Sequence, residues 1–264
     1  MNYFFRIYYF LIHFVTARNS HGFGVHSPYL FDFVQYVISE KNPYYIYADI
    51  EKQRTKLLND TSLIDKIDFG RGESKKIKIS EIAATSLCSP RKGQLLCRLV
   101  NYHNLNNILE LGTSLGVSTA YLGSLSNNRN CITLEGCENT ANIARQTFLA
   151  LNLTNIEIIT GDIDKTLQIA LNKLSIVDFV YIDANHTFDA TIRYFELILP
   201  KLSENAIVVF DDIYWSKDMK RAWELIKTYS KVTSTFDLYH FGIVFFNPDL
   251  HAKNYKLRFQ NLFK

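Results

Sequence analysis

From residue 89 onward, short apolar runs alternate with helical patterns. The runs predict strands, because a strand covered on both faces reads as a continuous apolar segment, whereas a helix shows apolar residues every three or four positions. Helical patterns separate the first five runs, which predicts a parallel sheet with helices on both faces. The predicted strands are 108–111, 131–135, 156–160, 177–183, 206–211, 232–238 and 241–246.

The last two predicted strands are connected differently. Only Tyr239 and His240 separate them, and a two-residue connection makes an antiparallel hairpin. The expected fold is therefore α/β: a Rossmann-like, doubly wound, mostly parallel seven-stranded sheet with a C-terminal antiparallel strand. We expect a mainly helical N-terminal cap or lid over 1–88 and the sheet domain over 89–264.

The N-terminal region lacks this strand-helix rhythm. Its first segment, MNYFFRIYYFLIHFV, is shorter than the roughly 20 residues of a membrane span and is interrupted by Arg6 and His13. We expect an amphipathic helix packed on the domain, with peripheral membrane contact or pairing with a second copy as alternatives. Ser27-Pro28 predicts a helix start, and 59–78 reads as a mobile loop.

Composition narrows the class of protein. The chain has 264 residues and a net charge of +3 without a long basic run, so nucleic acid is not an expected partner. Its four cysteines form no C-x-x-C pair and have no metal-ligand spacing with histidine. This pattern indicates reduced thiols in a cytoplasmic protein.

A glycine turn follows the strand at 108–111. Gly112 and Gly116 allow a tight turn and a close approach of the backbone to a ligand. A dinucleotide site would need a third glycine, which is absent. Two readings remain: Gly112–Gly116 (GTSLG) fits the G-x-S-x-G nucleophile elbow, and Glu110–Gly116 fits the S-adenosylmethionine (SAM) turn E-x-G-x-x-x-G.

Acidic residues mark successive strand ends. Ligands of an open parallel sheet bind beyond the carboxyl ends of its strands. Glu135 could accept both hydroxyls of a ribose, and Asp162 could face an adenine amino group. Any single acid could instead be a solvated charge or a helix cap. The acids in question are Glu110, Glu135, Asp162, Asp183, Asp211 and Asp212.

Three of these acids follow later strands, outside the part of the sheet that is expected to bind the adenosine-containing cofactor. Asp183, Asp211 and Asp212 could supply oxygen ligands to a hard divalent cation, leaving positions for water and substrate. Two adjacent aspartates would repel each other without a cation. The alternative is that Asp212 caps the next helix and no metal binds.

The chain resembles class I SAM-dependent methyltransferases of the O-methyltransferase type over roughly residues 89 to 246. Lys92-Gly93-Gln94, Leu109–Gly112 and Gly116-Val117-Ser118 are similar to the catechol O-methyltransferase pattern. The stretch 181–202, YIDANHTFDATIRYFELILPKL, resembles methyltransferase family 24. Asp211-Asp212 stands where the catechol enzymes carry Asp-Asn, and looks like the triple-aspartate variant of bacterial sugar O-methyltransferases.

The resemblance implies transfer of a methyl group from SAM to a hydroxyl of a small molecule, with Mg²⁺ or another divalent cation orienting and acidifying the acceptor. Glu135 would hold the ribose, Asp162 the adenine side, and Asp183 would lie near the methyl sulfonium. His186 falls where the catechol enzymes carry a basic lysine, so it is the expected base. The expected metal ligands are Asp183, Asp211 and Asp212. The residues expected at the methionine end are Glu110, Gly112, Thr113, Gly116 and Ser118.

Two other functions fit parts of the sequence. An α/β-hydrolase-type esterase would use Ser114 as nucleophile, His240 as base and Asp211 to orient that base. That fold needs several strands before the elbow, and none are evident in 1–106. A non-catalytic SAM-fold binding module would keep the glycine turn but no acceptor site; the acids at the later strand ends argue against it.

Overall fold

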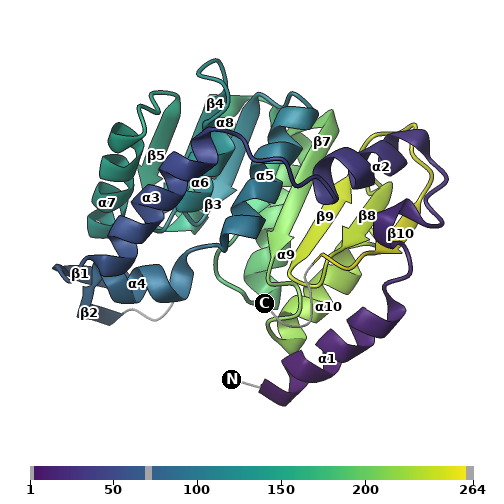
Figure 1. Ribbon diagram of the computed structural model, residues 1–264, viewed down its shortest axis with the longest axis horizontal. Coiled ribbons are helices and arrows are strands. Elements are labelled where there is room, and N and C mark those ends of the chain that lie inside the picture. Colours follow the sequence, from purple (N-terminus) through teal and green to yellow (C-terminus); the bar gives the residue numbers. More distant parts are fainter. Residues whose placement is uncertain (1–2, 69–72, 260–264) are drawn as a thin grey trace. The chain divides into compact units, whose positions relative to one another are not determined.

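The computed structural model describes residues 3–68 and 73–259 (Figure 1). The chain forms two compact units, Met1–Glu40 with Asp178–Lys264 and Lys41–Val177. Within the described ranges, no helix is long and apolar enough to cross a membrane. The domain boundary expected near residue 88 stays a prediction.

The large sheet is mixed and mostly parallel. Its eight strands are β3 (Asn107–Leu111), β4 (Asn130–Glu135), β5 (Ile156–Thr160), β6 (Val177–Ile182), β7 (Leu202–Asp211), β8 (Ser234–Asp237), β9 (Phe241–Phe245) and β10 (Lys253–Lys256). Their order is β10-β8-β9-β7-β6-β3-β4-β5, and β9 is antiparallel to both β7 and β8. The predicted Rossmann-like fold is confirmed. The sequence analysis missed β10, a four-residue strand parallel to β8.

In the unit 41–177, the parallel strands β3, β4 and β5 are surrounded by helices. Ser89 begins one of them: its hydroxyl accepts a hydrogen bond from Lys92 N at 3.4 Å, and Pro90 occupies the first turn. The helices are α3 (Ile46–Asn59), α4 (Ile79–Ser86), α5 (Pro90–Tyr102), α6 (Val117–Gly123), α7 (Glu138–Ala150) and α8 (Ile163–Leu174).

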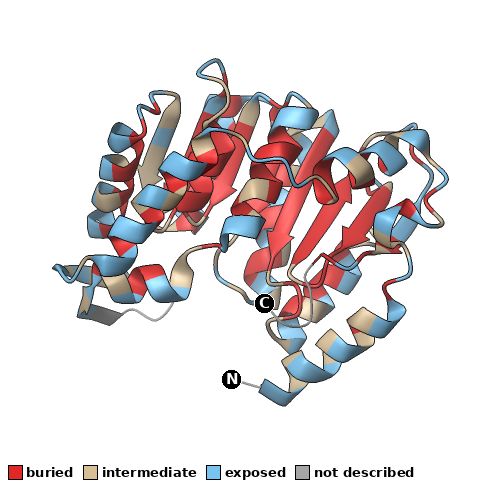
Figure 2. Cartoon of the chain, in the orientation of Figure 1, coloured by how far each residue is buried: buried red, intermediate tan, exposed pale blue. Residues whose placement is uncertain are grey.

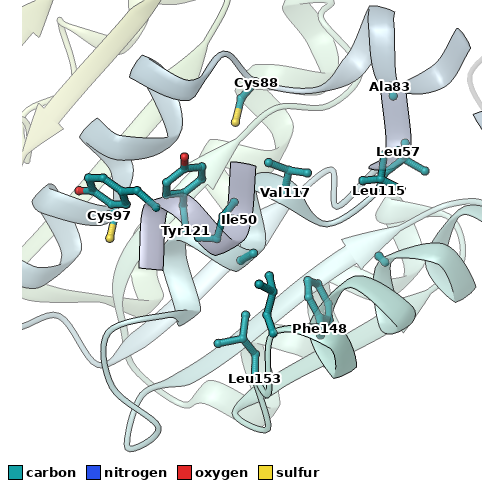
Figure 3. Packing of buried hydrophobic residues seen from close by; sticks show 14 of the residues in the cluster. Ile50, Leu57, Ala83, Cys88, Cys97, Leu115, Val117, Tyr121, Phe148 and Leu153 are labelled. Carbon is teal, nitrogen blue, oxygen red and sulfur yellow. The ribbon is translucent and has the colours of Figure 1, made fainter. Parts of the chain in front are cut away.

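One apolar cluster joins α3 through α7 (Figure 3). Ile50 of α3, Tyr121 of α6 and Phe148 of α7 are buried within it. Tyr121 keeps its hydroxyl satisfied by donating to Glu51 Oε1 at 2.7 Å. Because α3 and α4 share this cluster, the segment before residue 88 stabilises the glycine turn that precedes α6.

A β-hairpin replaces the mobile loop expected over 59–78. Strands β1 (Leu63–Asp68) and β2 (Glu73–Lys78) are antiparallel; the tip that connects them, 69–72, lies outside the described residues. The Asp65 carbonyl accepts a hydrogen bond from Asn139 Nδ2 at 2.8 Å, so β1 lies against the start of α7. The loop prediction was wrong here because the charged residues of this segment concealed its strand pattern.

In the other unit, β8 and β9 are fully buried, and β7 is buried over its last six residues, Ala206 to Asp211 (Figure 2). Ser27 accepts from Leu30 N at 3.5 Å, which confirms the predicted helix start at Ser27-Pro28. The helical elements of this unit are α1 (Tyr3–Thr16), η1 (Ser20–Gly22), α2 (Pro28–Phe33), η2 (Val34–Ile38), α9 (Phe188–Ile198), η3 (Leu199–Lys201) and α10 (Lys217–Ile226).

Helix α1 packs on the turn between β8 and β9, which confirms the expected packed N-terminal helix. His13 Nε2 lies 3.1 Å from Asp237 Oδ1, and both side chains are 4% exposed. Tyr9 stacks on Tyr214 with ring centroids 5.7 Å apart, and Phe10 contacts Tyr239 edge-on at 5.1 Å. The polar contact between His13 and Asp237 is therefore surrounded by aromatic side chains.

Candidate active site

The glycine turn after β3 requires its glycines. Gly112 has φ +104° and Gly116 has φ +83°, and Ser114 between them is also left-handed at +49°. A Cβ on Gly116 would lie 2.7 Å from the Phe148 ring. The N–H groups of Gly112 and Thr113 both donate to the Leu134 carbonyl, at 3.0 and 3.1 Å. The turn is thereby fixed to the carboxyl end of β4.

Glu110 lies beneath this turn and has no exposed surface. Its Oε2 accepts from the Thr133 hydroxyl at 2.7 Å and from the Thr119 hydroxyl. Burial raises the pKa of Glu110, although the nearby hydroxyls of Ser118, Thr119 and Thr133 oppose that rise. A side chain without exposed surface cannot contact a ligand in this conformation. Glu110 therefore acts on the turn itself.

Two more residues of the turn are also buried. Thr113 is 1% exposed, and its hydroxyl lies 2.6 Å from the Thr133 hydroxyl. Ser118, at the start of α6, is 7% exposed. Among the residues expected at the methionine end, Gly112 keeps partial exposure. Of these five residues, Gly112 is therefore the most accessible to a ligand.

Backbone hydrogen bonds hold the carboxylate of Glu135 in place at the end of β4. Its Oε2 accepts from Ser114 N at 2.8 Å and its Oε1 from Cys137 N at 3.0 Å. Burial raises its pKa, while the N–H groups of Cys137 and Ser114 and the charge of Lys66 oppose the rise. The N–H of Gly136 is a third backbone donor to this carboxylate, and Glu135 remains partly exposed. This donor set fits the two hydroxyls of a ribose.

Asp162 begins α8 just beyond β5. Its Oδ1 accepts from Asp164 N at 3.1 Å, so it is an N-cap, as the alternative reading allowed. The preceding Gly161 has φ +133° and donates from its N–H to the Glu135 carbonyl at 2.9 Å. Asp162 is thus brought next to the end of β4 and remains partly exposed.

In the unit that contains β6 and β7, two acids meet at one tyrosine. The Tyr181 hydroxyl lies 2.8 Å from Asp211 Oδ2 and 3.3 Å from Asp183 Oδ2. Asp212 N donates to Asp211 Oδ1 at 2.7 Å, and the backbone of Asp212 is left-handed at φ +51°. Asp212 Oδ1 lies 3.9 Å from His240 Nδ1, so His240 is paired with an acid, although not with Asp211.

His186 lies beside the first of these acids. Its Nε2 is 3.4 Å from Asp183 Oδ1, and its ring is 6.3 Å from that of Trp215. Both His186 and Asp183 are partly exposed. A histidine next to a carboxylate can be oriented for proton transfer, and such contacts are often long without substrate.

The donor chemistry of Asp183, Asp211 and Asp212 suits a hard divalent cation, because all the side-chain donors are carboxylate oxygens. Their arrangement does not form a ready ligand set. Over residues 3–68 and 73–259, no group of three or more His, Cys, Asp or Glu side chains is placed to hold a metal ion. The residues thus fit the ion in chemistry but not in position.

Several neighbours of the predicted residues were missed from the sequence. Tyr181 precedes Asp183 by two positions in a strand, so the two-residue period could have identified it. Ser86, whose hydroxyl lies 2.7 Å from that of Ser114, gives no such signal. Lys66 comes from the hairpin that was read as a loop.

Part of the chain is similar to known methyltransferases. Residues 109–213 match the family model described as a methyltransferase domain. A catechol O-methyltransferase from Niastella koreensis is 31% identical over 128 residues, which are 47% of this chain and 57% of that protein. The chain therefore spans little more than half the length of this curated relative.

Two solved structures share the fold. The O-methyltransferase from Bacillus cereus, in complex with SAH, is 24% identical with a TM-score of 0.56, over 80% of this chain and 94% of that one. TomG from Streptomyces achromogenes, an O-methyltransferase in complex with SAM, is 22% identical with a TM-score of 0.54, over 75% and 97%. These matches do not support the esterase or the non-catalytic module. Residues 109–213 are therefore similar to a methyltransferase domain, part of the chain is similar to a catechol O-methyltransferase, and the fold is shared with these two O-methyltransferase structures.

Proposed function

We propose that this protein transfers the methyl group of SAM to a hydroxyl of a small molecule. The observation that carries the proposal is Glu135, a partly exposed carboxylate at the end of β4 that backbone N–H groups of Ser114, Gly136 and Cys137 hold in place. The catechol O-methyltransferase relative and the SAH and SAM complexes of the structural neighbours support this reading.

In the proposed SAM site, the residues of the glycine turn have two different roles. Gly112, which keeps partial exposure, would be closest to the methionine end of SAM. Glu110, Thr113, Gly116 and Ser118 are buried, so they would act by holding the turn in its left-handed conformation. Asp162, capping α8 next to β5, would face the adenine side.

The acceptor half would use His186 and Asp183. SAM supplies a methyl group already activated on a sulfonium, so the protein must mainly align the acceptor oxygen, and such alignment is worth about 7 to 11 kcal/mol. His186 would take the acceptor proton at Nδ1, because its Nε2 faces Asp183 Oδ1 at 3.4 Å. Asp183 would orient the imidazole and stabilise its protonated form.

A divalent cation, Mg²⁺ or a similar ion, is the second part of the acceptor proposal. Asp183, Asp211 and Asp212 would bind it after their side chains move, because they are not placed as a ligand set in this structure. Their oxygen donors and the Tyr181 hydroxyl shared between two of them support this assignment. Calorimetric titration with Mn²⁺ tests binding directly: heat that disappears in Asp211→Asn supports the site. Equal binding by both proteins, or none, contradicts it.

Cofactor binding is tested by calorimetric titration of the full chain with SAH. Glu135→Gln keeps the shape but loses the carboxylate, and a hydrogen bond to a charged group is worth about 1.5–3 kcal/mol, so we expect about 10- to 100-fold weaker binding. Glu138→Gln is the matched control, because this exposed acid pairs with Arg145 at the surface. Failure of the unchanged protein to bind SAH would overturn the proposal.

Methyl transfer is tested separately with a panel of catechols and other vicinal diols. We expect product with the unchanged protein and at least about a hundredfold less with His186→Gln, since positioned bases contribute about 10²–10⁴ in rate. SAH affinity should not change in this variant. Product formation unaffected by His186→Gln would remove this residue from the proposal.

A further inference from the structure

Helix α1 carries apolar residues on two opposite faces. The inner face packs through Phe10 and His13 on the β8–β9 turn and its flanking Asp237, and through Tyr9 on Tyr214, which follows β7. A surface helix normally presents charged or polar residues on its other face. In α1 that face is apolar, at helical spacing, and its exposed fractions are Phe4 85%, Ile7 43%, Tyr8 59%, Leu11 52% and Val15 72%.

We name these five residues, Phe4, Ile7, Tyr8, Leu11 and Val15, the outer stripe. Figure 2 shows α1 mainly in the colours of exposed and intermediate residues. The helix has 14 residues, which at 1.5 Å each gives about 21 Å. A bilayer core is about 30 Å thick, so α1 is long enough to lie along a membrane surface but not to span it.

The charged residues of α1 and of the segment that follows it, up to Asp32, are all basic. The sequence contains no acidic residue before Asp32, and α1 is flanked by Arg18. Further cations come from the C-terminal segment: Arg258 lies 4.1 Å from the centre of the Phe14 ring and donates to the Phe14 carbonyl at 2.9 Å. Lys256 is joined to the residues just after α1 through its carbonyl, which accepts from Asn19 N at 3.1 Å.

We propose that the outer stripe inserts into the interface of a membrane that contains anionic lipids, with α1 lying in the membrane plane. Tyrosine and phenylalanine favour the level of the lipid headgroups, and arginine and lysine beside them attract anionic lipid. The buried contact of His13 with Asp237 fixes which face of α1 is turned outward.

A second copy of the chain fits this face less well. In a two-fold dimer, the same surface meets itself, so Arg18 and Arg258 would approach their own copies or each other. The described part of α1 offers no carboxylate to pair with them. Like charges across an interface disfavour association, whereas an anionic lipid surface complements them.

Co-sedimentation of the full chain with lipid vesicles tests the proposal. We expect binding to vesicles containing phosphatidylserine, weaker binding to pure phosphatidylcholine, and loss of the difference at high salt. Phe4→Ser with Leu11→Ser should weaken binding by about tenfold or more, because two large apolar side chains no longer leave water. Leu149→Ser with Ile169→Ser is the matched control, since both residues are exposed on helices α7 and α8.

The results of these experiments show whether a membrane or a second copy of the chain covers the outer stripe. Binding lost in Phe4→Ser with Leu11→Ser, but kept in the control, supports the proposal when circular dichroism and the unfolding midpoint are unchanged. No sedimentation of the unchanged protein with anionic vesicles overturns it. Light scattering that shows a dimer dissociated by the same two substitutions, without vesicle binding, assigns the stripe to a second copy.

Discussion

Asp237→Asn perturbs the ion pair that joins α1 to the sheet. Asp237 is 3% exposed and accepts from Tyr214 Oη at 2.7 Å and Tyr239 N at 2.9 Å, in addition to its contact with His13. A hydrogen bond to a charged group contributes about 1.5–3 kcal/mol and a neutral one about 0.5–1.5. Each of the three contacts therefore weakens by about 1 kcal/mol, and we expect about 3 kcal/mol lower free energy of unfolding.

The pH dependence adds a second signature. Burial raises the pKa of Asp237, but its contacts with His13, Tyr214 and the Tyr239 N–H outweigh this and hold the pKa below its usual range. A depressed carboxyl pKa contributes stability that is present above the unfolded value of about 3.9 and is lost as pH falls through the folded value. Asp237→Asn should remove this part of the acid dependence.

Urea unfolding, followed by intrinsic fluorescence at several pH values, measures both effects. Asp249→Asn is the control, because Asp249 is exposed and its change should stay within about 0.5 kcal/mol. If Asp237→Asn costs less than about 1 kcal/mol at neutral pH and leaves the acid limb of the stability curve unchanged, the ion pair does not hold α1 in the way described.

Two further substitutions test the site. Gly116→Ala should lower the free energy of unfolding by about 2–4 kcal/mol, because it combines a left-handed φ with a Cβ 2.7 Å from Phe148. Thermal unfolding measures this change, and an unchanged midpoint would contradict the expected strain at residue 116. Tyr181→Phe removes the hydroxyl between Asp183 and Asp211, so methyl transfer should fall by about tenfold while SAH affinity stays constant. An equal loss of SAH affinity would place Tyr181 in cofactor binding instead.

Much of the fold was predictable because its strands are buried on both faces. The predicted strand at 108–111 corresponds to β3, and the two-residue connection at Tyr239 and His240 predicted the antiparallel β9. The hairpin of β1 and β2 was missed because its strands, LIDKID and ESKKIK, are rich in charge. Propensity and apolar periodicity give little signal for such exposed strands.

The site was predictable as a set of positions but not as a set of contacts. The spacing of the predicted strands alone placed Glu135 and Asp162 at neighbouring strand ends. The hydrogen bond from Gly161 N to the Glu135 carbonyl confirms that these two ends are adjacent. Spacing could not show that Glu110 is fully buried, since that depends on hydroxyls from Thr119 and Thr133. The pairing of His240 with Asp212 depends on a backbone turn at φ +51°, which no local sequence pattern indicates.

The aromatic segment that contains α1 is an obvious target for truncation when the protein is produced for study, because an exposed apolar segment can lower solubility. Such trimming would leave Asp237 buried without His13 and would uncover the rings of Tyr214 and Tyr239. Tyr239 also neighbours His240, which faces Asp212. A shortened protein that lost activity would thus say little about catalysis, and detergent or lipid during purification is the safer remedy.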